Sequence, residues 1–122
     1  MPVSSQNMEL TASLTVIRDT DADATSEADV NTGAATLYII QIDNSANSTQ
    51  AVFLKLYNAT APTIGTTAPD FVLRVAGGAT VRLAIAEGLS FPTGLSFACV
   101  TAGGTGGTTS PTSDVSVVLV VS

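Results

Sequence analysis

The segment Gln50-Ala-Val-Phe-Leu-Lys-Leu-Tyr-Asn58 decides the fold class of this chain. In an extended conformation its side chains alternate between two faces, with Val52, Leu54 and Leu56 on one and Phe53, Lys55 and Tyr57 on the other. A period of two, in a run rich in large apolar residues, is typical of a β-strand. We therefore expect a strand here, with its leucines facing a core.

Six further segments carry strand patterns, and the residues between them are rich in Asn, Ser, Gly, Thr and Pro. The expected strands are residues 9–16, 36–43, 70–75, 80–85, 95–101 and 115–121. Helical periodicity is nearly absent, and the one helix-compatible stretch, residues 19–30, is acidic and contains threonine, which favours a loop. The pattern predicts an all-β fold: a single antiparallel β-sandwich of about seven strands, Ig-like or jelly-roll-like.

The length of 122 residues indicates one domain, a β-sandwich spanning residues 1–122. Residues 1–8 are a candidate extended N-terminal arm. Residues 18–35 and 102–113 are expected as long loops. The second of these is rich in glycine and threonine, so we expect it to be mobile or to be ordered by a neighbouring protein.

The alternation also predicts which side chains form the core. These are Leu10, Leu14, Ile40, Ile42, Leu54, Leu56, Leu73, Leu83, Phe97, Val117 and Leu119. Strand 36–43 is apolar on both faces, which favours a central place in its sheet. Strand 115–121 is also apolar on both faces, so a partner or a central place must cover it. Val118 and Val120 are the candidate partner-facing residues of that strand.

Composition excludes several classes of site. The chain has no histidine and a single cysteine, Cys99, so it can form no Ser-His-Asp or Cys-His catalytic system, no intrachain disulfide and no cysteine metal cluster. Cys99 shares a face with Leu95 and Phe97 and is expected to be a small buried apolar residue. We expect no enzymatic activity and no cofactor.

The charge distribution bears on partners. The net charge is −6, and the four basic residues, Arg18, Lys55, Arg74 and Arg82, are scattered along the sequence. Nucleic acids and anionic membranes attract clustered basic residues, so neither is expected as a partner. The first residues carry no pattern of a secretory signal, which favours synthesis in the cytoplasm.

Two arginines flank a glycine pair in a way that suggests a contact. If residues 70–75 and 80–85 formed a hairpin around Gly77 and Gly78, Leu73 would face Leu83 and Arg74 would face Arg82. Like charges opposite each other destabilise a sheet. Either the arginines splay into water, or the strands belong to different sheets, or the arginines meet a carboxylate-rich partner. Arg74 and Arg82 are therefore candidate interface residues.

Asp19, Asp21 and Asp23 form the one cluster that resembles a metal site. Alternating carboxylates can surround Ca²⁺ with oxygen atoms. An EF-hand loop, however, requires glycine where Ala24 stands, glutamate where Val30 stands, and flanking helices. A solvated acidic loop is therefore the preferred interpretation, and we expect no metal.

Three stretches resemble a known group of proteins: Val52-Phe-Leu-Lys-Leu-Tyr-Asn-Ala-Thr-Ala-Pro-Thr-Ile-Gly-Thr-Thr-Ala-Pro69, Val75-Ala-Gly-Gly-Ala-Thr-Val-Arg-Leu83 and Glu87-Gly-Leu-Ser-Phe-Pro-Thr-Gly-Leu-Ser-Phe-Ala98. They resemble small β-sandwich virion proteins of tailed bacteriophages, including capsid decoration (cement) proteins. The resemblance spans roughly residues 37–121 and rests on strand and turn patterns, so it carries no site residues across.

The resemblance implies a structural virion protein on the outer surface of a phage capsid, where it would bind the major capsid protein and stabilise the shell. It also implies a homo-oligomer, with a trimer as the expected form. An alternative from a different class is an Ig-like binding or adhesion module of a phage tail or a cell surface.

Overall fold

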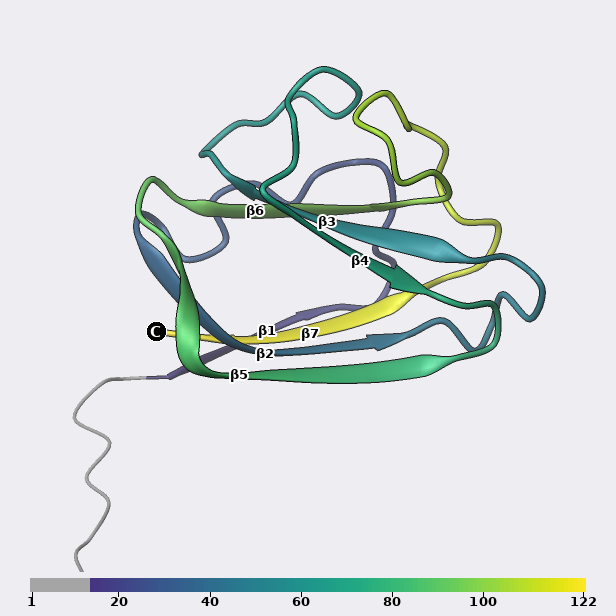
Figure 1. The fold of residues 1–122 in the computed structure, drawn as a ribbon, viewed down its shortest axis with the longest axis horizontal. Helices are drawn as coiled ribbons and strands as arrows, with labels where there is room; N and C mark the ends of the chain where they lie inside the picture. Colours follow the sequence, from purple (N-terminus) through teal and green to yellow (C-terminus); the bar gives the residue numbers. More distant parts are fainter. Residues whose placement is uncertain (1–13) are drawn as a thin grey trace, which may run out of the picture.

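The computed structural model describes residues 14–122, which form seven β-strands and no helix (Figure 1). The strands are β1 (Thr15–Asp19), β2 (Ala35–Asp43), β3 (Val52–Asn58), β4 (Phe71–Val75), β5 (Thr80–Phe91), β6 (Leu95–Val100) and β7 (Ser116–Val121). Within this part of the chain there is accordingly no helix long and apolar enough to cross a membrane.

The strands form two antiparallel sheets packed face to face, which confirms the predicted β-sandwich. The four-stranded sheet has the order β1-β7-β2-β5, and the three-stranded sheet has the order β4-β3-β6. β2 lies between β7 and β5, as its two apolar faces predicted. β7 lies between β1 and β2, so a central place in the sheet covers both edges of the last strand.

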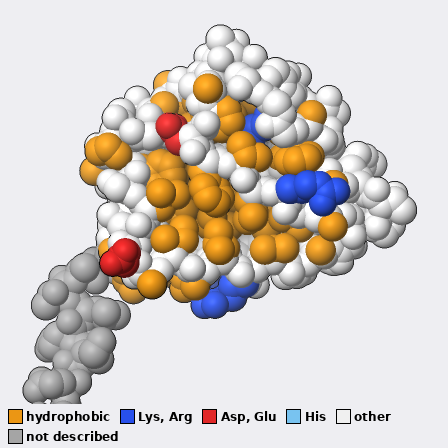
Figure 2. Space-filling view, viewed as in Figure 1, with side chains coloured by type: hydrophobic (Ala, Val, Ile, Leu, Met, Phe, Trp, Pro, Cys, Tyr) orange, Lys and Arg blue, Asp and Glu red, His pale blue; other side chains and the backbone are white. Residues whose placement is uncertain are grey.

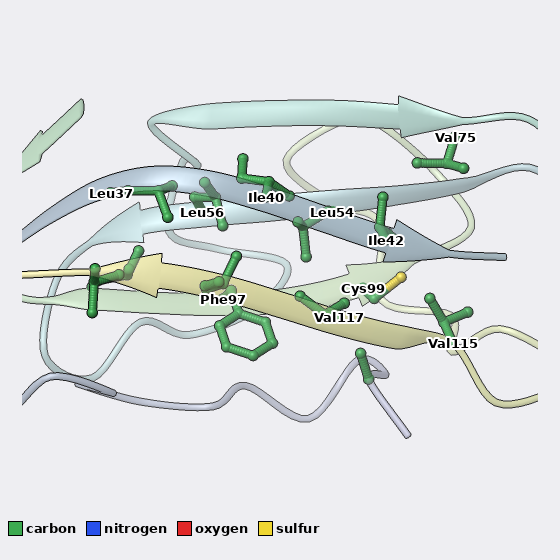
Figure 3. Packing of buried hydrophobic residues seen from close by; sticks show 14 of the residues in the cluster. Leu37, Ile40, Ile42, Leu54, Leu56, Val75, Phe97, Cys99, Val115 and Val117 are labelled. Carbon is green, nitrogen blue, oxygen red and sulfur yellow. The ribbon is translucent and has the colours of Figure 1, made fainter. Parts of the chain in front are cut away.

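The core lies between the two sheets (Figure 3). Seven of the predicted core residues are buried, namely Ile40, Ile42, Leu54, Leu56, Phe97, Val117 and Leu119. Leu73 and Leu83 are only half-buried, because they lie on the outermost strands β4 and β5. Leu10 lies outside the described residues.

The first strand turns towards the core the face opposite to the one predicted. Leu14 and Val16 are 45% and 51% exposed, so the assignment of Leu14 to the core was wrong. In the observed register Ile17 pairs with the buried Leu119, which turns Ile17 inward and Val16 outward. Alternation distinguishes the two faces of a strand, but it does not say which face another sheet will cover.

The hairpin considered around Gly77 and Gly78 does not form; β4 and β5 belong to different sheets, which confirms one of the alternatives left open for Arg74 and Arg82. The glycines instead carry the chain from one sheet to the other against the backbone of the β2–β3 turn. A Cβ atom on Gly77 would lie 2.8 Å from the Gln50 nitrogen and 2.9 Å from the Ser48 oxygen, and Gly78 has φ +78°. Close approach and a left-handed conformation therefore explain this glycine pair.

β5 is longer than predicted because it turns a corner between the sheets (Figure 1). Its register with β2 jumps from Ile39↔Ala84 to Leu37↔Leu89, so residues 85–88 of β5 bulge opposite Tyr38 alone. Beyond this bulge the strand rises towards the three-stranded sheet and leads into β6. The bulge also lets Leu37 and Ile40 both face the core.

Loops close one open side of the sandwich. The segment between β1 and β2, expected as a long loop, runs beside β6: Glu27 forms an antiparallel bridge with Phe97, and the Val30 nitrogen donates to the Leu95 oxygen at 2.8 Å. The Cys99 nitrogen donates to the Asp23 oxygen at 2.8 Å. This loop therefore pairs with the edge of β6 as a neighbouring strand would.

Candidate functional site

The outer face of the four-stranded sheet is the candidate binding surface. On β7, Val117 and Leu119 point into the core, while Val118 and Val120 point away from it and are half-buried. The central position of β7 covers the edges of this strand but not its outward side chains. Most outer faces of antiparallel sheets carry polar residues, so the valines need an explanation.

An apolar row crosses this face from one edge of the sheet to the other. Val16 pairs with Val120, Val120 with Ile39, and Ile39 with Ala84. Val16 is 51% exposed, Val120 and Ile39 are half-buried, and Ala84 is exposed. We call Val16, Val120, Ile39 and Ala84 the apolar row; Leu14, at 45% exposure, precedes it on the same face of the first strand.

The next row carries two arginines. Arg18 pairs with Val118, Val118 with Gln41, and Gln41 with Arg82. Both arginines are exposed and stand at the two ends of the row, three strand spacings or roughly 14 Å apart. We call Arg18, Val118, Gln41 and Arg82 the arginine row. The apolar row therefore lies beside the arginine row, which has one positive charge at each end.

The structure separates Arg74 from the other three predicted interface residues. Arg82, Val118 and Val120 lie together on the outer face of the four-stranded sheet. Arg74 pairs with Phe53 on the outer face of the other sheet, so the predicted juxtaposition of Arg74 and Arg82 was wrong. The basic residue that shares a face with Arg82 is Arg18, which lies far from it in the sequence.

A polar row borders the arginine row on the side away from the apolar row. It consists of Ser116, Asp43 and Thr80, in register across three strands. The Ser45 backbone nitrogen donates to the Asp43 carboxylate at 2.9 Å, and the Thr80 hydroxyl donates at 3.2 Å. Hydrogen bonds from Ser45 and from Thr80 lower the pKa of Asp43, so this carboxylate stays ionised.

The three aspartates considered for Ca²⁺ do not converge. The Asp19 carboxylate accepts from the Asp21 nitrogen at 3.1 Å, and the Asp23 carboxylate accepts from the Thr25 nitrogen at 2.9 Å. Among residues 14–122, no three Asp, Glu, Cys or His side chains gather into a group that could hold a metal ion. These carboxylates act locally, by capping turns.

Asp19 nevertheless has an unusual environment. It points inward at the edge of the sandwich, into a cleft of about 120 Å³ that is also lined by Ile17, Arg18, Glu27, Val30 and Phe97. Burial, with the negative charges of Glu27 and Asp21 adding to it, raises the pKa of Asp19 to about 6. The cleft is small, and its charged residues Arg18, Asp19 and Glu27 stand beside apolar ones, so we assign it a structural role.

Sequence reasoning missed the role of Lys55. Lys55 lies on the outer face of the three-stranded sheet, yet its side chain is fully buried, because the β3–β4 and β6–β7 loops fold over that face (Figure 1). Its ammonium group donates to the Gly104 carbonyl and, at 3.5 Å, to the Gly107 carbonyl. The glycine-rich loop, expected to be mobile or ordered by a neighbour, is thus held by a lysine of its own chain.

Cys99 is buried, as predicted. Burial, with smaller contributions from the charges of Asp19 and Asp23, raises the pKa of its thiol to about 12. A thiol that stays protonated is a poor nucleophile and a poor metal ligand, so Cys99 contributes packing alone.

Comparison with known proteins assigns no family: no protein-family model, no curated protein and no solved structure shows a significant match to this chain.

Proposed function

We propose that this protein is a non-catalytic structural protein that attaches to a larger protein assembly through the outer face of its four-stranded sheet. In its most specific form the proposal is a capsid decoration protein, which binds the major capsid protein on the outside of a phage head. The observation that carries the proposal is the apolar row, which crosses all four strands and lies in the open.

The apolar row supports attachment because Val16 and Ala84 are exposed and Val120 and Ile39 are only half-buried on the outer face. Contiguous exposed apolar patches on a folded protein commonly mark surfaces that bind other proteins. Val16 is half exposed, and fully burying a valine side chain contributes about 1.5–3 kcal/mol. Covering Val16, Val120 and Ile39 would therefore contribute a few kcal/mol per copy, which many copies on one particle would multiply.

The arginine row supports a partner of complementary charge. The chain has a net charge of −6, whereas this face presents Arg18 and Arg82, and the carboxylate of the adjoining polar row, Asp43, accepts hydrogen bonds from Ser45 and Thr80. A partner surface with an apolar centre and acidic residues on one flank would fit it. Such charge complementarity acts mainly on partner choice and association rate.

Binding to purified virus heads and tails, compared between matched variants, tests the proposal. Val16→Asp places a charge in the apolar row, and Val72→Asp places the same charge on the outer face of the other sheet, where Val72 is 39% exposed. We expect wild type and Val72→Asp to occupy heads equally, and Val16→Asp to lose at least tenfold in occupancy.

Binding to tails alone would instead support the alternative, a tail-associated binding module. Equal occupancy of heads by both variants would refute attachment through this face.

A further inference from the structure

We propose that residues 8–13 of one copy of this chain add as a strand to the outer edge of β5 in a second copy. The inference concerns a different surface from the proposed attachment face and does not depend on that function. It rests on an uncovered side of the sandwich, on the sequence of the N-terminal segment, and on the distance between them.

The sandwich is open on the side of β4 and β5. β4 pairs only with β3, and β5 only with β2, among the described strands. On the opposite side the segment between β1 and β2 covers the edge of β6. Nothing in residues 14–122 does the same for β4 and β5.

This opening exposes apolar side chains that belong to the core. Four of them, Phe71 and Leu73 of β4 and Val81 and Leu83 of β5, pack against the core but are only half-buried. Figure 2 shows the result as a broad hydrophobic patch between the two edge strands. We call these four residues the β4–β5 opening. An apolar edge of this kind invites pairing with another strand.

The N-terminal segment has the sequence of a strand that would fit there. In Met8-Glu-Leu-Thr-Ala-Ser13 the apolar Met8, Leu10 and Ala12 alternate with polar residues. One face of such a strand can be buried while the other stays in water. The segment has six residues, and the part of β5 before its bulge, residues 80–84, has five, so the two lengths are comparable. Met8, Leu10 and Ala12 would then cover Leu83 and Leu73 across the opening.

The geometry requires that this strand come from another copy. Its position lies beyond β5, four strand spacings or roughly 19 Å from β1. Ser13 is followed by only one residue before β1 begins at Thr15, and two residues of extended chain span at most roughly 7 Å. The segment therefore cannot reach the β5 edge of its own chain.

Each copy then offers one strand and one acceptor edge. Such a head-to-tail contact closes into a ring when the rotation between copies permits it.

Two variants of the full chain test the proposal by sedimentation at micromolar concentration. Leu10→Asp puts a charge on the inward face of the added strand, whereas Thr11→Asp puts the same charge on its outward face. We expect wild type and Thr11→Asp to sediment as the same multimer, and Leu10→Asp as a 12.3 kDa monomer. A monomeric wild type, or multimers of equal stability for both variants, would overturn the proposal.

Cross-linking between chains locates the contact. Chains carrying Ala12→Cys are mixed with chains carrying Leu83→Cys and treated with a short bismaleimide; the matched control pairs Ala12→Cys with Thr66→Cys, an exposed position in the β3–β4 loop. We expect a two-chain product from the first mixture only. Equal yields from the two mixtures, or loss of the multimer in Val120→Asp but not in Leu10→Asp, would refute this site.

Discussion

Replacing Lys55 separates packing from hydrogen bonding under the glycine-rich loop. The side chain is fully buried between β3 and this loop, and its ammonium group donates to two backbone carbonyls. Lys55→Met keeps most of the buried length and removes the charge. Lys55→Ala removes both. The two variants therefore differ mainly in the methylene groups that fill the space below Gly104 and Gly107.

The expected free energies of unfolding favour Lys55→Met over Lys55→Ala. Burying an ammonium group costs several kcal/mol, and hydrogen bonds to a charged donor return about 1.5–3 kcal/mol each. Gly104 is exposed, so its carbonyl can bond to water when the lysine is gone. We expect Lys55→Met to be within about 1 kcal/mol of wild type or more stable. Lys55→Ala should be about 2–3 kcal/mol less stable than Lys55→Met, because it leaves a cavity.

The pH dependence gives an independent check. Burial lowers the pKa of Lys55 below its ordinary value of 10.5. Between the folded and unfolded pKa values the unfolded chain holds the proton and the folded chain does not, so this group makes the wild type more stable as pH rises. Any advantage of Lys55→Met should therefore shrink as the pH approaches 10.5.

Urea unfolding of wild type and both variants, at pH 7 and at alkaline pH, measures these differences. If Lys55→Met loses as much stability as Lys55→Ala, the ammonium–carbonyl bonds hold the loop and the reasoning from burial is wrong. Equal stability of all three proteins would show that the loop contributes nothing to the fold.

Three further changes test the core and its edges. Tyr57→Phe should leave the free energy of unfolding unchanged or raise it by about 1 kcal/mol, because the buried hydroxyl has no hydrogen-bond partner among the described residues. A fall in this free energy of more than about 1 kcal/mol in urea unfolding would contradict the expectation. Leu54→Ala, fully buried between the sheets, should cost about 2–5 kcal/mol, whereas Val72→Ala on the surface should cost less than about 0.5 kcal/mol in the same assay. Because the folded pKa of Asp19 is about 6 and its ordinary value is 3.8, the folded chain retains a proton that the unfolded chain has lost between these values, so wild-type stability should fall as pH rises through this window. Solvent screening limits the fall to about 1 kcal/mol, and Asp19→Asn should abolish it; an unchanged slope in the variant would assign the effect to another group.

Local alternation predicted the strands and the centre of the core, but not which surfaces stay open. Leu54 and Ile42 were placed correctly because strands packed between two sheets bury their apolar face whatever the topology. Leu14 was misplaced because the same alternation fits either side of an edge strand. The glycine pair at Gly77 misled for a related reason: it permits a tight hairpin and also a close crossing between sheets.

The candidate site was predictable only in part. Val118 and Val120 follow from a strand that is apolar on both faces, and the structure places them on an open surface. Arg18 could not be assigned to that surface, because its place depends on a pairing between β1 and β7 that spans most of the chain. The burial of Lys55 depends on loops distant in sequence, although the aromatic neighbours Phe53 and Tyr57 on its face were a sign that this face is covered.

The two halves of the sandwich are covered unequally, and β5 lies where the uncovered surfaces meet. Loops cover the outer face of the three-stranded sheet at Lys55 and Tyr57 but not on β4, and the segment before β2 covers the edge of β6. The outer face of the four-stranded sheet and the β4–β5 opening have no such cover in residues 14–122. Along β5 these surfaces alternate residue by residue, with Arg82 and Ala84 facing outward and Leu83 facing the opening. Because neighbouring side chains face different surfaces, Ala84→Asp should weaken attachment to a partner but not the association of copies. Leu83→Asp should weaken the association of copies together with the packing of this edge of the core.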